Sequence, residues 1–427
     1  MILVLITFLI LALLAVPIGY VMGISSLFGL ISLGGMDFLR ILVIRFHSGL
    51  NSFLLLAIPF FILTAEFMNR SGITNLIVDF VNKSMGHFRG GLSHVNIVTC
   101  TLFGTLTGSA VTVALGVGGT LIPAMKKEGY TGAYSAAVTG AAACLGPIIP
   151  PSIIAVVFSS IIRETSVKSL FAAGVIPGLF LSVLLLVVSV IVSYRRHYSR
   201  KKRASFKEIL NGTKNAILPL LTPFIILGPI FLGMTEITEA AAMGALYVLI
   251  LGVFVYKTLK LKDILESTFS TAKFCGIVFL LMCTANALGW FIARSGISMA
   301  IATFVASNIQ SPNMILFLLT IFLLIVGCLV DTLPAVVILV PILAPALMAI
   351  GFHPVHVAMI ILVNLNIGNA TPPMGMALMT TAKIAEVSYE SAIKEALPFI
   401  LVEITICFIV AYFPIISLWL PHLLGLI

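Results

Sequence analysis

Long apolar runs separated by short polar segments dominate the chain. A transmembrane helix needs about 20 predominantly apolar residues. Runs of that kind predict membrane spans near residues 2–16, 18–35, 52–69, 170–193, 215–233, 237–256, 272–292 and 396–420. Two stretches, 37–51 and 257–271, mix apolar and charged positions and predict amphipathic segments. The pattern therefore predicts an all-α protein that crosses a membrane many times.

Two longer apolar stretches carry a polar interruption near the middle. Residues 92–125 are interrupted by Gly104-Thr-Leu-Thr-Gly-Ser109, and residues 312–349 by Gly327-Cys-Leu-Val-Asp-Thr332. Each arm of the first stretch has about 12 to 16 residues, enough for roughly half a membrane. A re-entrant hairpin explains that stretch better than its alternative, a single tilted span with a kink. We expect the same hairpin in the second stretch.

Glycine and proline break two further apolar helices, predicted near 132–163 and 354–385. The first break is Cys144-Leu-Gly-Pro-Ile-Ile-Pro-Pro-Ser152, and the second is Ile367-Gly-Asn-Ala-Thr-Pro-Pro-Met374. Proline inside a helix removes a hydrogen bond and clashes with the preceding turn. In lipid the freed backbone groups need another partner, so such a break persists only where it lines a cavity or is buried in protein.

The two breaks belong to an internal repeat. Gly146, Pro150 and Pro151 recur as Gly368, Pro372 and Pro373, each 222 positions later. Each half contains five crossings and one hairpin that returns to its own side. Because five is odd, the second copy must be inverted relative to the first. The fold class predicted is therefore two inverted repeats, each with about five transmembrane helices, one of them discontinuous, plus a re-entrant hairpin.

The repeat also predicts the domain organisation. The first repeat covers 1–194 and the second 215–427, joined by a basic linker at 195–214. In a moving-domain arrangement, the first two spans and the amphipathic segment of each half would form a scaffold. The scaffold would comprise 1–51 and 215–271, and the transport elements 52–194 and 272–427.

Composition supports a polytopic membrane protein. Of 427 residues, 60% are hydrophobic and 9% charged, with a mean hydropathy of +1.20, whereas soluble domains carry roughly 25% charged residues. The net charge of +9 does not indicate nucleic acid, since much of it lies in the linker beside a span. The six cysteines have no paired spacing and are expected to be small packing residues.

Charge also predicts the orientation. If the linker is cytoplasmic, the predicted topology places all but five of the 24 lysines and arginines inside. This excess matches the positive-inside rule. The first hairpin then opens to the cytoplasm, the second to the outside, and both termini are periplasmic. The five outer cations are Arg40, Arg45, Arg163, Lys168 and Arg294.

The predicted topology gathers two hairpin tips and two helix breaks at the membrane midplane. Backbone carbonyls there are hard oxygen donors that a small cation satisfies, and hydroxyls of Thr107 and Thr371 would complete its shell. The half-helix N-termini after each break suit an anionic substrate. The combination predicts cation-coupled import of an anion. The alternative is that the breaks are only structural kinks.

Several other polar residues are candidates for chemistry. Asp331 stands where the first hairpin has Ser109, and it would either accept backbone N–H bonds from its loop or contact the substrate, ion or proton directly. Glu66 is expected to snorkel or pair. His353-Pro-Val-His356 has ligand-like spacing but no cysteine or carboxylate beside it, so metal binding is not expected there. The chain has no His-Glu-x-x-His, no Gly-x-Gly-Asp and no nucleophile–base pair, so we predict no enzyme.

The ordered motifs identify a family. They are Leu56-Ala-Ile-Pro-Phe60, Arg70-Ser-Gly-Ile73, Thr107-Gly-Ser109, Ile122-Pro-Ala-Met-Lys-Lys-Glu-Gly-Tyr130, Gly146-Pro-Ile-Ile-Pro-Pro-Ser152, Gly233-Met-Thr-Glu-Ile-Thr-Glu-Ala-Ala-Ala242 and Gly368-Asn-Ala-Thr-Pro-Pro-Met374. With them, essentially the whole chain resembles the large membrane subunit (DctM-like) of tripartite ATP-independent periplasmic (TRAP) transporters. The resemblance implies an elevator-type secondary transporter of the bacterial inner membrane that imports an organic acid of the C4-dicarboxylate, sialic acid or sugar-acid type.

The resemblance also implies partners and a coupling ion. The partners would be the lipid bilayer, a small four-helix membrane subunit and a periplasmic substrate-binding protein. We expect the small subunit to be a separate chain, because no extra four-helix block precedes Met1 or follows the linker. The coupling ion would be Na⁺. A stand-alone sodium/anion symporter of related inverted-repeat fold is the alternative.

Candidate site residues follow by position from the resemblance. One sodium ion would be held by Gly104, Thr107, Gly146, Ile149 and Pro150, and the other by Gly327, Gly368, Thr371 and Met374. Gly104 departs from the family's frequent serine, so only its carbonyl could serve. The substrate would contact Ser109, Pro151, Ser152, Asp331, Thr332, Asn369 and Pro373.

Overall fold

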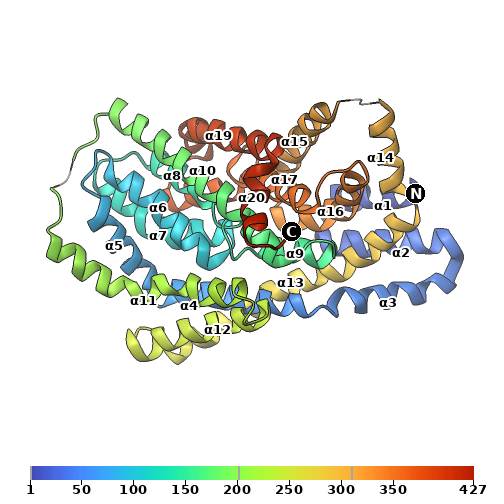
Figure 1. Cartoon of the computed structure of the whole chain (residues 1–427), viewed down its shortest axis with the longest axis horizontal. Helices are drawn as coiled ribbons and strands as arrows, with labels where there is room; N and C mark the ends of the chain where they lie inside the picture. The colour runs from blue at the N-terminus through green and yellow to red at the C-terminus, as the bar shows by residue number, and fades with distance from the viewer. Residues whose placement is uncertain (1, 201, 309–310) are drawn as a thin grey trace.

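The computed structural model describes residues 2–200, 202–308 and 311–427. Lys201, part of the predicted basic linker, lies outside the described residues, as do Met1, Ile309 and Gln310. All regular elements in this described part are helices (Figure 1). Seven are long and apolar enough to cross a membrane, or eight if the bent pair α19–α20 forms one span. The predicted all-α polytopic fold is confirmed.

The first half contains ten α-helices and two short 3₁₀ turns, η1 (Gly35–Phe38) and η2 (Phe53–Leu56). The helices are α1 (Ile2–Leu13), α2 (Ile18–Gly34), α3 (Leu39–Leu50), α4 (Ala57–Arg70), α5 (Ile73–Met85), α6 (Gly91–Thr107), α7 (Ala110–Lys127), α8 (Gly132–Ala143), α9 (Ile153–Ile161) and α10 (Val167–Arg195).

The second half repeats this order. Its helices are α11 (Phe206–Phe231), α12 (Ile237–Ile250), α13 (Leu261–Arg294), α14 (Ile297–Asn308), α15 (Pro312–Leu329), α16 (Thr332–Ala349), α17 (Pro354–Ile367), α18 (Met376–Ala385), α19 (Tyr389–Tyr412) and α20 (Pro414–Leu423). A π-turn, η3 (Leu251–Val255), extends α12, and a 3₁₀ turn, η4 (Gly368–Ala370), follows α17.

Some predicted elements differ from the structure. Residues 261–271 of the predicted amphipathic segment and the predicted span 272–292 form one 34-residue helix, α13, because no glycine or proline interrupts residues 261–275. Residues 73–85, for which no span or hairpin was predicted, form helix α5, whose apolar residues Ile73, Ile77 and Val81 share one buried face. The predicted last span bends by 64° between α19 and α20 at Phe413.

The first interrupted stretch is a hairpin of helices α6 and α7. The chain turns at Gly108, whose φ of +60° favours glycine. Ser109 then caps α7 by accepting a hydrogen bond from the Thr112 N–H at 3.5 Å. Leu106 and Thr107 at the tip are each 1% exposed. A tip buried this deeply ends inside the protein, as a re-entrant hairpin requires. Its arms of 17 and 18 residues are longer than predicted.

The second interrupted stretch is the pair α15 and α16, which turns at Val330 and Asp331. These two helices diverge from their tip, and both pack against α17. Figure 1 shows α6 and α7 toward one end of the molecule and α15 and α16 toward the other. The two hairpins therefore point at the centre from opposite ends.

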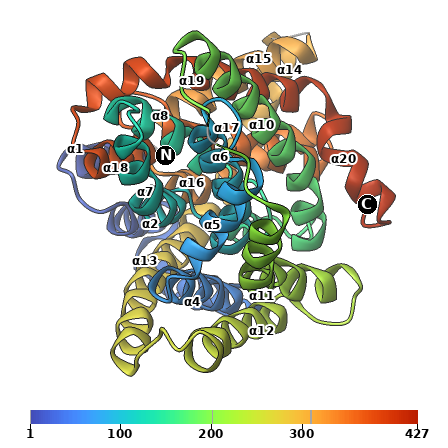
Figure 2. The same cartoon turned by 90° about the vertical axis from the view of Figure 1, so that its left-hand side faces the viewer.

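A long helix borders this central group. Helix α13 packs along α2, α3 and α4, and it also contacts α16. Figure 2 places α4, α11, α12 and α13 together below the hairpins and broken helices. Helix α13 thus borders the second hairpin, while α4 and α11 contact α6 of the first hairpin directly.

Candidate functional site

The tip of the first hairpin packs against the first break through glycine. A Cβ atom on Gly104 would lie 2.9 Å from the Gly146 Cα, and one on Gly108 would lie 2.7 Å from the Pro151 carbonyl oxygen. Distances below 3.0 Å are too short for a real Cβ atom, so only glycine permits this approach. The structure thereby brings Gly104 and Gly146, two of the five residues predicted for the first sodium site, into contact.

The second hairpin repeats this contact. A Cβ atom on Gly327 would lie 2.6 Å from the Leu365 carbonyl oxygen, and one on Gly368 would overlap the Gly327 backbone. The Met374 N–H donates to the Cys328 carbonyl oxygen at 3.2 Å. The residues predicted for the second sodium site therefore also lie at one contact. In both repeats a hairpin glycine meets the glycine of the break.

A central cavity of about 240 Å³ lies between the two hairpin tips. Among its walls are four of the residues predicted to bind substrate: Ser109, Asp331, Thr332 and Asn369. Helices α7, α9, α16 and α18 all begin at residues that line this cavity, so four helix N-termini lie at it. Unpaired N–H groups and the positive end of the helix dipole favour an anion at such a place.

The second tip is held by a short hydrogen-bonded chain. The Asn369 side-chain amide donates to the Thr332 hydroxyl at 2.6 Å, and that hydroxyl donates to the Leu365 carbonyl oxygen at 3.4 Å. Asn369 Oδ1 is buried and has no hydrogen-bond partner within the described residues. Asp331 precedes the first turn of α16 and lines the cavity. Its position suits both roles considered for it.

The other three predicted substrate residues are not among those lining this cavity. The Ser152 hydroxyl donates to the Pro147 carbonyl oxygen at 2.5 Å and accepts from the Ala155 N–H at 3.3 Å, so it caps α9. The Pro151 carbonyl oxygen faces Gly108. Pro373 is exposed. Both Pro-Pro bonds, 150–151 and 372–373, are cis.

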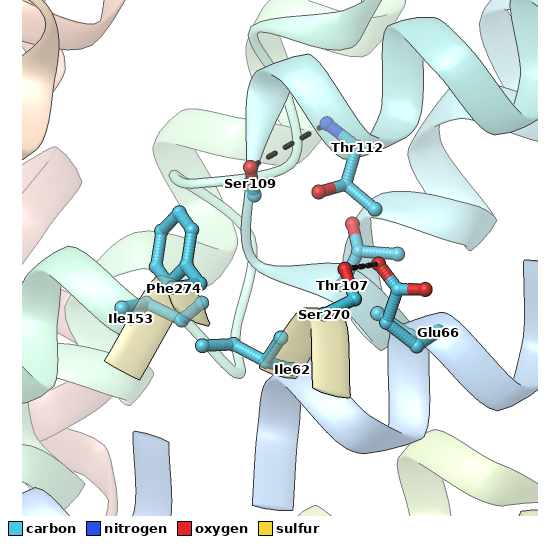
Figure 3. A pocket seen from close by; sticks show the side chains of 9 residues that line it. Ile62, Glu66, Thr107, Ser109, Thr112, Ile153, Ser270 and Phe274 are labelled. Carbon is cyan, nitrogen blue, oxygen red and sulfur yellow. Dashed lines mark hydrogen bonds between the residues drawn. The ribbon is translucent and has the colours of Figure 1, made fainter. Parts of the chain in front are cut away.

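A smaller cavity of about 70 Å³ adjoins the first tip (Figure 3). It contains the Thr107 side chain, whose buried hydroxyl oxygen has no hydrogen-bond partner in the described structure. Opposite it, the Ser270 hydroxyl donates to Glu66 at 3.2 Å. Glu66 also pairs with Arg70 at 3.5 Å, which agrees with the pairing expected for it. Hydroxyl and carboxylate oxygens are the ligands that hard cations prefer.

Residues predicted for the second sodium site form more hydrogen bonds than Thr107 does. The Thr371 hydroxyl donates to the Ile367 carbonyl oxygen at 3.0 Å and keeps its lone pairs as acceptors. The Met374 carbonyl oxygen accepts a hydrogen bond from the Tyr389 hydroxyl at 2.9 Å.

The described residues contain no group of three or more His, Cys, Asp or Glu side chains able to hold a metal ion. His356 is occupied by Ser417 and the Ala411 carbonyl.

Sequence reasoning missed one acidic residue, Glu403. It lies in α19 with no exposed surface, and neither carboxylate oxygen has a hydrogen-bond partner among the residues described. Its repeat counterpart, 222 positions earlier, is the fully buried Leu181. The available signal was a lone acid inside the predicted span 396–420, since an acid in a membrane segment is costly and by default functional.

Comparison with known families gives a match over nearly the whole chain. The model for "Tripartite ATP-independent periplasmic transporter, DctM component" matches residues 5–416. The chain belongs to the DctM family. The resemblance predicted from its motifs is confirmed. Because the family consists of transporter permease subunits, this DctM-family chain is a transporter subunit and no enzyme.

Curated relatives of this DctM-family chain are large permease subunits. The sialic acid TRAP transporter large permease protein SiaM of Vibrio cholerae is 37% identical over 88% of each chain. The C4-dicarboxylate large permease protein DctM of Pseudomonas aeruginosa is 36% identical over 91% of each chain. The ectoine large permease protein TeaC of Halomonas elongata is 33% identical over 97% of each.

Two solved structures share the fold of this DctM-family chain. The YdaH transporter of Alcanivorax borkumensis superposes with a TM-score of 0.66 at 14% identity, over 91% of this chain and 90% of its own. MtrF of Neisseria gonorrhoeae superposes with a TM-score of 0.59 at 13% identity, over 90% of this chain and 85% of its own. At this identity the likeness describes the fold alone.

Proposed function

We propose that the protein takes up an organic acid together with sodium, as the large subunit of a TRAP transporter in a bacterial inner membrane. The observation that carries this proposal is the central cavity, at which the first turns of α7 and α16 both begin. Helix N-termini that meet at one cavity favour a carboxylate, and α9 and α18 begin at the same cavity. The names of the relatives agree with a small organic solute of the sialic acid, C4-dicarboxylate or ectoine kind.

Sodium coupling is supported by the two glycine contacts beside that cavity. Each contact sets the backbone of a hairpin against a break in a helix, and a threonine, Thr107 or Thr371, stands three positions after one of its glycines, Gly104 or Gly368. Sodium would travel as a second substrate and neutralise the charge of the acid. A cation bound next to the anion site lets the sodium gradient drive uptake.

We further propose that the hairpins and broken helices move as one body against a scaffold. Helix α13 is continuous through the predicted boundary at 271/272, so we assign the whole helix to the scaffold, where it packs on α2 and α3. The basic linker would be cytoplasmic and both termini periplasmic. The partners would be the small four-helix subunit and a periplasmic binding protein.

Reconstitution tests the function directly. The chain and its small subunit are placed in proteoliposomes, and uptake of radiolabelled organic acids is measured with purified binding protein outside. An inward sodium gradient should activate uptake, and the same gradient of potassium should not. Uptake that proceeds without binding protein would favour the stand-alone symporter, and equal uptake in potassium would contradict sodium coupling.

A further inference from the structure

A third cavity, larger than the two described above, is lined by positively charged side chains that have no role in the central cavity. Its volume is about 750 Å³, and it lies between α3, α13 and the connection from α9 to α10. Three cationic side chains line it: Arg45, Arg163 and Lys168. No aspartate or glutamate is among its lining residues. We call it the basic cavity.

The three cations are not neutralised by the protein. Within the described residues none of them forms an ion pair with a carboxylate. The Arg45 guanidinium lies over the Trp290 ring, 5.3 Å from its centroid, which holds it at the cavity wall. Arg45 Nε is buried and has no hydrogen-bond partner in the part of the chain described. A buried donor of this kind lacks an acceptor oxygen.

Three helices line both the basic cavity and the central cavity. Helix α9 lines the central cavity with Ile153 and the basic cavity with Ser159. Helix α13 does the same with Phe274 and Met282, and α16 with Leu333 and Pro341. Eight residues of helix measure about 12 Å. The two cavities therefore lie about one small molecule's length apart.

We propose that the basic cavity is an anion-binding antechamber, where Arg45 and Arg163 hold the carboxylate of the substrate before it reaches the central cavity. The carboxylate class and the direction of travel rest on the proposed function. All three cations are among the five that the predicted topology places on the periplasmic side of the membrane. A cavity lined by one sign of charge focuses the field and raises the local concentration of the opposite ion. The antechamber would thus collect the anion that the binding protein releases.

Fluorescence quenching tests the anion site without any transport. The sequence contains two tryptophans, and Trp419→Phe leaves Trp290 in the wall of the cavity as the sole reporter of this chain. The measured quantity is the iodide preference, defined as the quenching constant of iodide divided by that of neutral acrylamide. In the purified full chain at low salt, the iodide preference of Trp290 should be at least about twofold higher than that of free tryptophan. Three variants test which side chains attract the iodide. Arg163→Gln and Arg45→Gln each remove one positive charge, and Arg45→Lys retains the charge at position 45.

The matched control is Arg40→Gln, because Arg40 lies on the same helix and predicted side but is not among the residues lining the cavity. The iodide preference should fall about twofold in Arg163→Gln and Arg45→Gln. It should remain at the parental value in Arg45→Lys and Arg40→Gln. No iodide preference in the parent, or an equal fall in Arg40→Gln, would overturn the proposal.

Uptake supplies the second readout. At substrate levels well below saturation, Arg45→Gln should slow uptake severalfold while the maximal rate is kept, and added salt should reduce the difference. Unchanged subsaturating uptake in both glutamine variants would overturn the antechamber role. If the parent shows iodide preference but no sodium-driven uptake of any acid, the proposed function fails and the anion site stands.

Discussion

The side-chain amide of Asn366 donates a hydrogen bond to the backbone carbonyl oxygen of Cys144 at 2.5 Å, and the two residues occupy equivalent positions 222 apart in the two repeats. A residue that bonds to its own equivalent lies close to the axis that relates the repeats. The bond joins the two broken helices two residues before Gly146 and Gly368. The bond therefore holds the two breaks beside each other near that axis.

This bond predicts an unequal effect of two identical substitutions. Asn366→Ala leaves a carbonyl at the first break without its partner, which costs about 1–3 kcal/mol in a buried site. Asn364→Ala is the control, because Asn364 is equally buried on the same helix but donates only to the Ile360 carbonyl of its own helix. Thermal unfolding in detergent should show a lower Tm for Asn366→Ala than for Asn364→Ala. Equal Tm values would contradict a special role for the axial bond.

The glycine contact at the second tip predicts a steric effect on transport. Gly327→Ala places a methyl group 2.6 Å from the Leu365 carbonyl oxygen, so the hairpin must shift away from the break. Overpacking of this kind costs about 1–3 kcal/mol. Uptake in proteoliposomes should fall strongly. Gly119→Ala, where nothing lies within 4 Å, should keep the parental rate. Full activity in Gly327→Ala would show that the contact can relax.

The unpartnered hydroxyl of Thr107 predicts a sodium-dependent change in stability. A ligand that binds only the folded state raises stability with its concentration. Sodium should therefore raise the parental Tm relative to potassium, and Thr107→Val should reduce that rise without lowering the Tm in potassium. Thr371→Val should also reduce the rise, but it additionally removes the bond to the Ile367 carbonyl. A sodium-induced rise that is the same in the parent and both variants would exclude these hydroxyls as ligands.

The buried carboxyl of Glu403 predicts a conflict between stability and activity. A buried polar group without a hydrogen-bond partner costs about 1–3 kcal/mol of stability, a cost that an apolar residue avoids. Glu403→Leu restores the residue found at the equivalent position, Leu181, and should raise the Tm. Uptake should fall, because an acid retained in a membrane helix is by default functional.

Two outcomes would contradict this. A lower Tm in both Glu403→Leu and Glu403→Gln would mean that the carboxyl stabilises the fold through a partner. Unchanged uptake in both variants would mean that the carboxyl has no part in transport. Leu181→Ile, a change of shape at the equivalent buried position, is the control for packing alone.

Local chemistry made the repeats and the breaks predictable. A glycine followed closely by two adjacent prolines interrupts a helix, so the pairs Pro150-Pro151 and Pro372-Pro373 marked both breaks without knowledge of their neighbours. A single proline is a weaker signal, since Pro123 and Pro177 lie inside continuous helices. Long apolar runs likewise predicted the spans near 52–69, 170–193, 215–233, 237–256, 272–292 and 396–420, whereas the predicted spans 2–16 and 18–35 form the shorter apolar helices α1 and α2. The ends of helices were less predictable. Helix α5 has apolar residues on one face only and therefore no continuous apolar run, and α13 begins in a polar segment and continues into a span.

The contacts that make the site depend on long-range packing. Glu66 meets Ser270 across 204 positions, and Arg45 shares a cavity with Arg163 although they belong to different elements of the chain. Such meetings depend on how whole helices pack, and the sequence near each residue carries no record of its distant partner. Two breaks, two hairpins and an inverted repeat could be read from the residues alone, because each is encoded in a local pattern. That an uncompensated basic cavity lies beside the central one follows only from the packing of α3, α9, α13 and α16.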